Sequence, residues 1–273
     1  MDSAECSGNN LDDDAMKLSE VMSLTGLVML VVSCSVKEDR DMCPCRLVLD
    51  MTDVDTLVVK YAEIVVTASD GYGMRDTLEV DAFDEGYMLE VPRGDVGVGV
   101  YFGAGGSVDD RGNLEIGYGN ECPTVYMHSS NVVAEGEMVV ESVAMRKNHC
   151  IMTIQVATET EFPFRLEAKG TVDGYEPGGE PSVGDFMYAM GTDADGFCQL
   201  VLPRQTDNSL VLEVHDDSQT LKSFALGEYV AASGYDWAEE DLRDIAITLD
   251  YSLTKIVVAV EDWDQEYVFN VVI

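Results

Sequence analysis

The chain has 273 residues, of which 46% are hydrophobic and 25% charged, so it can form one large domain or two smaller ones with substantial cores. It carries 52 Asp and Glu against 16 Lys and Arg, a formal net charge of −36 at pH 7. A protein with this negative charge repels the phosphates of nucleic acids and of anionic bilayers. We therefore expect no nucleic-acid partner and no electrostatic docking on a membrane. The three histidines are too far apart for a helical zinc motif and leave little general-base chemistry. We therefore expect no enzymatic activity, no cofactor and no metal site.

The amino terminus has the pattern of a bacterial lipoprotein signal. Residues 21–32 form an apolar stretch that is too short to span a bilayer but typical of the hydrophobic region of a signal peptide. The stretch ends in Ser33-Cys34, a small residue followed by a cysteine, as in the sequence that signal peptidase II cleaves. We predict a signal peptide over 1–33, cleavage before Cys34 and lipidation of the Cys34 thiol. The alternative interpretation is a buried apolar element that happens to precede a free cysteine.

The first 15 residues do not suit such a signal. They are acidic, whereas a signal peptide normally starts with a positively charged region. Met16 is followed by Lys17, which would supply that charge. Our hypothesis is that translation of the native precursor starts at Met16.

The remaining cysteines do not form a recognisable reactive site. Five of them follow Cys34, so at least one thiol is free even where export permits disulfides. Two of the five stand in Cys43-Pro44-Cys45, which is one residue shorter than a redox Cys-x-x-Cys motif. No second pair completes a four-thiolate zinc site, so we interpret this pair as structural.

Short strands are predicted along the rest of the chain, because β-branched and aromatic residues alternate with polar ones between clusters of turn residues. In chain order they are expected at 47–50, 56–68, 75–80, 87–91, 96–102, 137–145, 151–156, 164–172, 185–190, 197–202, 209–214, 221–226, 245–249, 255–260 and 267–273.

A single helix is predicted. Asp236 and Glu239 have the spacing of a capping box, which favours a short helix over 237–242. With almost no other helical signal, the fold class is all-β. The number of strands fits two tandem β-sandwich domains, over 47–148 and 149–273, that follow a lipidated tether over 34–46.

Two motifs resemble ligand sites but lack essential positions. The glycine cluster 103–106 has no third glycine at the position that a dinucleotide-binding loop requires, and no Lys-Ser or Lys-Thr pair follows it. Residues 192–196 resemble the start of a calcium loop, but Gly196 comes too early and the expected glutamate is absent. Asp195-Gly196 is better explained as a hairpin turn. No catalytic residue is therefore predicted.

The chain resembles the fimbrial anchor lipoproteins of the Bacteroidales, the anchoring subunits of type V pili. The resemblance extends over essentially the whole chain after residue 33, and its motifs occur in order: CSVKEDR (34–40), CPCRLVLD (43–50), GDF (184–186), LPRQ (202–205), DNSLVLEV (207–214), LGEY (226–229), SGYDW (233–237) and DLRDI (241–245). The acidic first 15 residues depart from the family pattern.

This resemblance implies an outer-membrane lipoprotein with two transthyretin-like sandwich domains that tethers the base of a pilus and limits its growth. Its partners would be the shaft subunits, joined by β-strand addition, and the outer membrane, reached through acyl chains on Cys34. The acidic residues Glu38, Asp39 and Asp41 resemble the surface-export signals of Bacteroidetes lipoproteins, so we expect the protein to be surface-exposed. Whether the C-terminal strand 267–273 is donated or retained is left open.

Two other functions remain as alternatives. A surface glycan-binding lipoprotein would have the same anchor and fold but would need a platform of exposed aromatic side chains. A secreted hydrolase would need two converging carboxylates in a cleft. The triplets Asp55-Thr56-Leu57 and Asp76-Thr77-Leu78 fit a pattern for O-glycosylation of the chain itself, although so short a pattern is common by chance.

Overall fold

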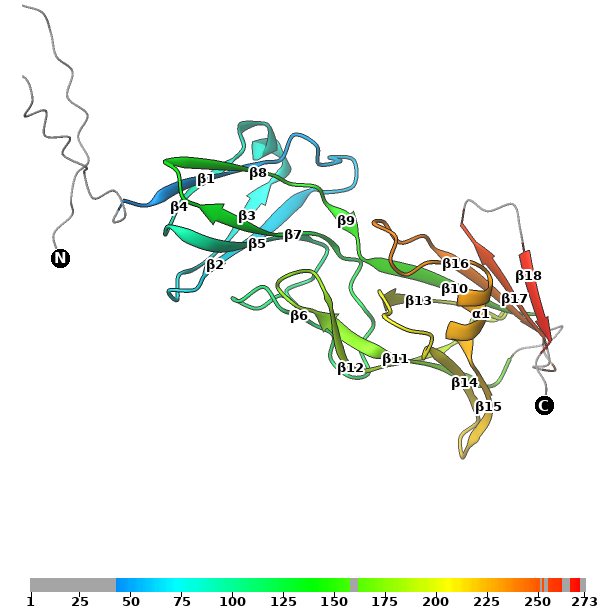
Figure 1. Cartoon of the computed structure of the whole chain (residues 1–273). Coiled ribbons are helices and arrows are strands. Elements are labelled where there is room, and N and C mark those ends of the chain that lie inside the picture. Colours follow the sequence, from blue (N-terminus) through cyan, green and yellow to red (C-terminus); the bar gives the residue numbers. More distant parts are fainter. Residues whose placement is uncertain (1–42, 158–161, 251, 253–254, 262–265, 271–273) are drawn as a thin grey trace, which may run out of the picture. The chain divides into compact units, whose positions relative to one another are not determined.

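The computed structural model describes residues 43–157, 162–250, 252, 255–261 and 266–270 (Figure 1). The predicted signal peptide and Cys34 lie outside the described residues, as does most of the tether. The all-β fold class is confirmed, because strands make up almost every regular element of the described chain.

The first half of the described chain forms two sheets. Sheet A has the strand order β4-β1-β8, and sheet B has the order β3-β2-β5-β7-β9. Their elements, together with the short strand β6 and the 3₁₀ turn η2, are β1 (Cys45–Asp50), β2 (Tyr61–Ala68), β3 (Gly73–Glu79), η2 (Val80–Glu85), β4 (Tyr87–Val91), β5 (Gly94–Phe102), β6 (Leu114–Glu115), β7 (Tyr126–Ala134), β8 (Met138–Ser142) and β9 (Arg146–Lys147).

Alternating side chains build the core between these two sheets. On β5, Val96, Val98 and Val100 are buried in the same cluster as residues of β1 and β2, and this alternation is the one that predicted the strand. The opposite face of β5 has glycines for a steric reason. A Cβ on Gly99 would lie 2.5 Å from the hydroxyl of Tyr101, whose buried ring covers this position. The Tyr101 hydroxyl donates a hydrogen bond to the Gly112 carbonyl at 2.8 Å.

The second half forms sheet C, with the order β12-β11-β14-β15, and sheet D, with the order β13-β10-β16-β17-β18. Their elements, together with the one α-helix of the described residues, are β10 (His149–Ala157), β11 (Arg165–Tyr175), β12 (Pro181–Gly191), β13 (Phe197–Pro203), β14 (Val211–His215), β15 (Thr220–Phe224), α1 (Leu226–Ala232), β16 (Ile245–Asp250), β17 (Lys255–Val260) and β18 (Glu266–Asn270). Residues 267–270 of the predicted C-terminal strand therefore lie in β18, which pairs with β17 of the chain's own sheet.

A segment of the first half packs on the second. β6 pairs with the end of β11, and a Cβ on Gly174 would lie 2.0 Å from the Leu114 carbonyl oxygen, so only glycine fits there. Residues between 104 and 127 accordingly belong to the core cluster of sheets C and D. β9 ends at Lys147 and β10 begins at His149, whereas the division into domains 47–148 and 149–273 stays a prediction.

The predicted helix over 237–242 is wrong. Asp236 does accept a hydrogen bond from the Ala238 amide at 2.8 Å, as a cap would, but the chain then continues as turns and bends. The guanidinium of Arg204 binds the carbonyls of Trp237, Glu239 and Glu240, which directs them toward the arginine rather than along a helix axis. The described chain has its α-helix instead at α1, which begins at Leu226, the last residue of the predicted strand 221–226.

The predicted hairpin at Asp195-Gly196 is wrong in its pairing. The segment is a tight turn, in which the Asp193 carboxylate accepts hydrogen bonds from the amides of Asp195 and Phe197 at 3.0 and 2.8 Å. Gly196 adopts a φ of 79°, which glycine tolerates best. The flanking strands β12 and β13 do not pair with each other but belong to sheets C and D, so the turn connects the two sheets of the sandwich.

Candidate functional site

Four sheet edges of the described chain are covered, those of β3, β4, β12 and β13, so the uncovered ones, among them β8 and β18, are the first candidates for an interface. Hydrogen bonds from tyrosine hydroxyls connect the edges of β3 and β4. The Tyr72 hydroxyl donates to the Glu90 carbonyl at 3.0 Å, and the Tyr87 hydroxyl donates to the Asp76 carboxylate at 2.6 Å. Burial and this hydrogen bond to Asp76 raise the pKa of Tyr87, so the phenol stays protonated. This side of the first sandwich is closed.

A loop covers two edges of the second half. The Gly119 amide donates to the Met187 carbonyl of β12 at 3.0 Å, and the Cys122 amide donates to the Val201 carbonyl of β13 at 3.3 Å. The Glu121 carboxylate accepts a hydrogen bond from the Val201 amide at 2.7 Å. The edge strand β15 is short and carries Lys222, a residue that discourages pairing.

The edge of sheet D at β18 differs from these. No described segment pairs with the outer edge of β18, and the strand EYVFN contains neither lysine nor proline. Phe269 packs onto the core with its ring centroid 5.1 Å from that of Tyr229, which holds the strand in place. Val268 is 54% exposed. This uncovered, mostly uncharged edge (the β18 edge) is suited to accept a further strand.

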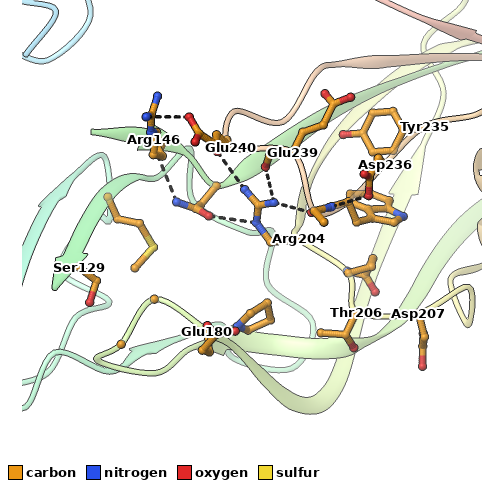
Figure 2. A pocket seen from close by; sticks show the side chains of 18 of the residues that line it. Ser129, Arg146, Glu180, Arg204, Thr206, Asp207, Tyr235, Asp236, Glu239 and Glu240 are labelled. Carbon is orange, nitrogen blue, oxygen red and sulfur yellow. Dashed lines mark hydrogen bonds and ion pairs between the residues drawn. The ribbon is translucent and has the colours of Figure 1, made fainter. Parts of the chain in front are cut away.

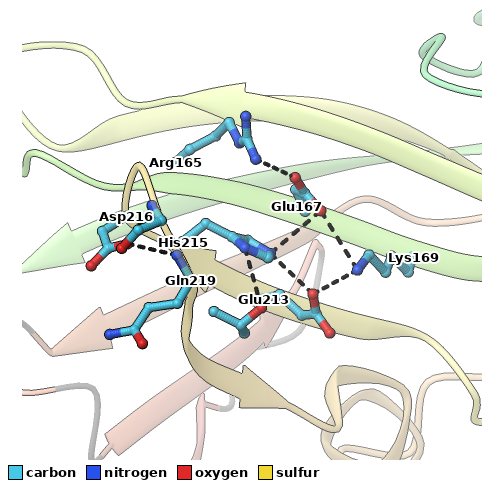
Figure 3. Close-up of polar contacts among 9 residues, drawn as sticks. Arg165, Glu167, Lys169, Glu213, His215, Asp216 and Gln219 are labelled. Atoms are coloured by element: carbon cyan, nitrogen blue, oxygen red, sulfur yellow. Dashed lines mark hydrogen bonds and ion pairs between the residues drawn. The ribbon is translucent and has the colours of Figure 1, made fainter.

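The outer face of sheet C carries a charged cluster (Figure 3). Glu167 and Glu213 stand directly opposite each other on β11 and β14, and the Nε2 atom of His215 lies 3.3 Å and 3.0 Å from their carboxylate oxygens. Lys169 donates to Glu213 at 2.6 Å, and Arg165 contacts Glu167 at 2.7 Å. The contact with Glu213 raises the pKa of Lys169, and the same contact lowers the pKa of Glu213.

Three residues of this cluster could ligate a metal ion. One ligand atom each from Glu167, Glu213 and His215 lies within 4.8 Å of the others. Lys169 and Arg165, however, already neutralise the two carboxylates at ion-pair distance. We therefore interpret the cluster as a cross-strand ion-pair network that relieves the repulsion between two opposed glutamates.

A cleft of about 790 Å³ lies beside these sheets (Figure 2). Its wall is formed by the ends of β7 and β12, the loop after β13 and the turn 235–240. Arg204 crosses the wall and binds three carbonyls of that turn and the Asn148 side chain. Arg146 pairs with Glu240 at 2.7 Å. The residues that line the cleft include Glu180, Gln205, Tyr235, Asp236, Trp237 and Ala238.

The sequence motifs that suggested ligands form no site in the described structure. Gly103 has a positive φ and lies so close to the Thr124 carbonyl that only glycine fits, which explains part of the glycine cluster by packing. Thr56 and Thr77 of the two glycosylation triplets are both exposed. The prediction of lipidation at Cys34 stays a prediction.

The described cysteines other than Cys43 are free and buried. They are Cys45, Cys122, Cys150 and Cys198. Burial raises the pKa of Cys150 to about 12 and that of Cys198 to about 11, so both thiols are protonated and unreactive near neutral pH. Cys45 is a buried residue of β1, as expected for a structural role. Among the described residues, no helix has both the length and the apolar character needed to cross a bilayer.

The platform that a glycan-binding lipoprotein would need is not formed by the described residues. Of their large aromatic side chains, Tyr118 and Phe197 are the exposed ones, and they belong to different segments. Both residues therefore fit isolated surface positions better than a stacking surface.

Solved structures share this fold, although no family model and no curated protein matches the sequence. The fimbrial anchor protein Mfa2 from Porphyromonas gingivalis aligns with a TM-score of 0.54 and 12% identity, over 81% of this chain and 98% of its own. A candidate polysaccharide-binding protein from Bacteroides thetaiotaomicron aligns with a TM-score of 0.59 and 16% identity, over 83% of this chain and 98% of its own. A candidate adhesin from Bacteroides ovatus aligns with a TM-score of 0.54 and 14% identity, over 84% of this chain and 95% of its own. The chain thus has the fold of Bacteroidales fimbrial and adhesin proteins.

Proposed function

We propose that this protein is a lipid-anchored fimbrial subunit that tethers the base of a pilus to the outer membrane. The Ser33-Cys34 sequence after an apolar stretch supports the lipid anchor. The similarity in fold to the anchor protein Mfa2 supports a place at the pilus base. Tethering itself needs no catalytic residue.

The pilus shaft is proposed to join the protein by β-strand addition at the β18 edge. This edge is the observation that carries the proposal, because no strand of the described residues pairs with its outer side, Val268 is exposed and the strand has no lysine or proline. An extended segment of a shaft subunit would form main-chain hydrogen bonds to β18 and extend sheet D by one strand. β18 itself stays paired with β17, so it would act as an acceptor rather than as a donated strand.

Anchoring at one end would also limit the length of the fibre. A subunit that occupies the last strand-accepting position while held in the membrane leaves no further position for growth at that end. One acyl chain binds a bilayer only marginally, whereas two or more hold a protein stably, so the proposed lipidation of Cys34 decides whether the fibre is retained.

The proposal is tested by electron microscopy of cells that lack the gene and of cells that carry Cys34→Ala. We expect overlong or shed pili in both strains, because the first lacks the terminating subunit and the second lacks its membrane anchor. Cys45→Ala serves as the matched control, since Cys45 is buried in β1 and has no place in the anchor. Pili of normal length and attachment in the deletion strain would contradict the function, and normal pili in Cys34→Ala alone would contradict only the lipid anchor.

A further inference from the structure

The outer face of sheet A carries a row of apolar side chains. Sheet A consists of β4, β1 and β8, which lie side by side (Figure 1). On β1, Leu47 and Leu49 are buried in the core shared with sheet B, so Val48 between them points away from that core. Val48 stands opposite Met88 of β4 and opposite Val140 of β8, and the three residues therefore form one row across the sheet.

This row is open to solvent and is extended by a fourth apolar residue. Met88 is 58% exposed and Val140 is 55% exposed, whereas Val48 between them is half-buried. Met138, which is 57% exposed, lies on the same face of β8, two residues before Val140. The sheet A cluster consists of Val48, Met88, Met138 and Val140. Adjacent exposed apolar side chains of this kind mark surfaces that contact a protein or a membrane.

The charges around the sheet A cluster differ from those of the chain as a whole. The formal net charge is −36, and the outer face of sheet C carries the ion-pair network of Figure 3, yet no acidic residue stands in the row described above. In the neighbouring row, Arg46 of β1 stands between Glu90 and Met138, so the nearest carboxylate has a cation opposite it. This part of sheet A can therefore approach an apolar surface with little repulsion and little loss of carboxylate hydration.

The sheet A cluster is also close in sequence to the proposed lipid anchor. Val48 stands 14 residues after Cys34. A fully extended chain of this length spans at most about 50 Å. Acyl chains on Cys34 would thus keep the cluster within that distance of a bilayer. Such tethering raises the effective concentration of the bilayer at the cluster, so a contact that is too weak for a free protein becomes populated.

We propose that the sheet A cluster docks on the bilayer that holds the Cys34 lipid, an inference that rests on the proposed lipid anchor. Interfacial binding grows with the apolar area that enters the bilayer surface, and the flexible side chains of Met88 and Met138 adapt readily to an irregular surface. The acyl chains would hold the protein at the membrane, and the cluster would decide which face the protein turns toward it.

The test is fluorescence quenching by lipids that carry bromine in their acyl chains. The full protein, as processed by its own cells, is reconstituted into vesicles of brominated phosphatidylcholine, with a fluorescent amino acid in place of Val140. The same amino acid replaces Val133 in the matched control. Val133 is also 55% exposed, but it lies on β7 of sheet B between two residues of the shared core, so it points away from that core on the other sheet. We expect quenching at position 140 to be at least about twofold stronger than at position 133.

Flotation of the vesicles in a density gradient tests the lipid anchor separately. A protein that does not float with the vesicles would contradict the lipid anchor and, with it, the docking. A protein that floats but is quenched equally at positions 140 and 133 would overturn the docking and leave the anchor in place. Equal quenching is also the result expected where a second copy or another protein covers the cluster.

A double variant tests whether the sheet A cluster makes the contact. Met88→Gln combined with Met138→Gln removes apolar surface beside position 140, and both residues are exposed, so the fold should be kept. Quenching at position 140 should fall to the level at position 133, while flotation is unchanged. Leu221→Gln is the control, because Leu221 is an exposed apolar residue of β15 and its replacement should leave quenching unaltered. Full quenching in the double variant would overturn the assignment to this cluster.

Discussion

The contact between Arg204 and the turn 235–240 permits a quantitative prediction. Its guanidinium donates to the carbonyls of Trp237, Glu239 and Glu240, the last two at 2.6 and 3.2 Å, and to the Asn148 side chain at 3.1 Å. A hydrogen bond to a charged group contributes about 1.5–3 kcal/mol net. The four bonds share one partly buried cation and are not additive, so we expect Arg204→Met to lower the free energy of unfolding by about 3 kcal/mol.

Urea denaturation followed by tryptophan fluorescence measures this loss. Arg204→Lys keeps the charge but not the planar fork, so it should still lose about 2 kcal/mol. Arg165→Met is the matched control, because Arg165 is 58% exposed in its side chain and forms an ion pair that should contribute less than about 1 kcal/mol. Should Arg204→Met cost no more than Arg165→Met, the explanation for the missing helix at 237–242 would be wrong.

Three further outcomes follow from the packing and the charges. Gly99→Ala should lower the free energy of unfolding by about 1–3 kcal/mol, because its Cβ would collide with the ring of Tyr101. In a double-mutant cycle, Tyr101→Leu should remove most of this cost. Additive losses of stability from the two substitutions would refute the collision. The Cys150 thiol, whose pKa burial raises to about 12, should resist iodoacetamide near pH 8 in the native protein and react after unfolding, and rapid native labelling would contradict its burial. Lys169 lowers the pKa of Glu213 below its ordinary 4.5, so the ion pair stabilises the fold above pH 4.5 and this stabilisation is lost as the pH falls through the folded pKa. Lys169→Met should therefore lower the free energy of unfolding near pH 7 and change it little near pH 3. An equal loss at both pH values would exclude the ion pair.

The strands could be predicted where one face alone is buried. The apolar pattern of 255–260 coincides with β17, and 245–249 coincides with all but the last residue of β16. β7 was missed because its sequence YMHSSNVVA has polar residues through the centre of the strand. Its pairing with β5 holds it in sheet B, and such pairing is tertiary information that local alternation does not contain.

The helix and the cleft could not be predicted for a related reason. Asp236 and Glu239 have the local pattern of a helix start, but Arg204, more than 30 positions away, takes the carbonyls that a helix would use. The cleft likewise joins residues from widely separated segments. The β18 edge was foreseeable only as a C-terminal strand, since its exposure depends on the order of strands in sheet D.

A pilus shaft subunit is proposed to join this protein at the β18 edge. The most direct measurement places a photo-crosslinking amino acid at Val268 in living cells, with the same amino acid at Val183 as the control. Val183 is also exposed, but it lies on β12, a strand whose edge the loop at Gly119 covers. Mass spectrometry of the crosslinked product should identify a fimbrial shaft subunit at position 268 and none at position 183. Crosslinks to shaft subunits at position 183 but not at 268, or at neither position, would contradict strand addition at this edge.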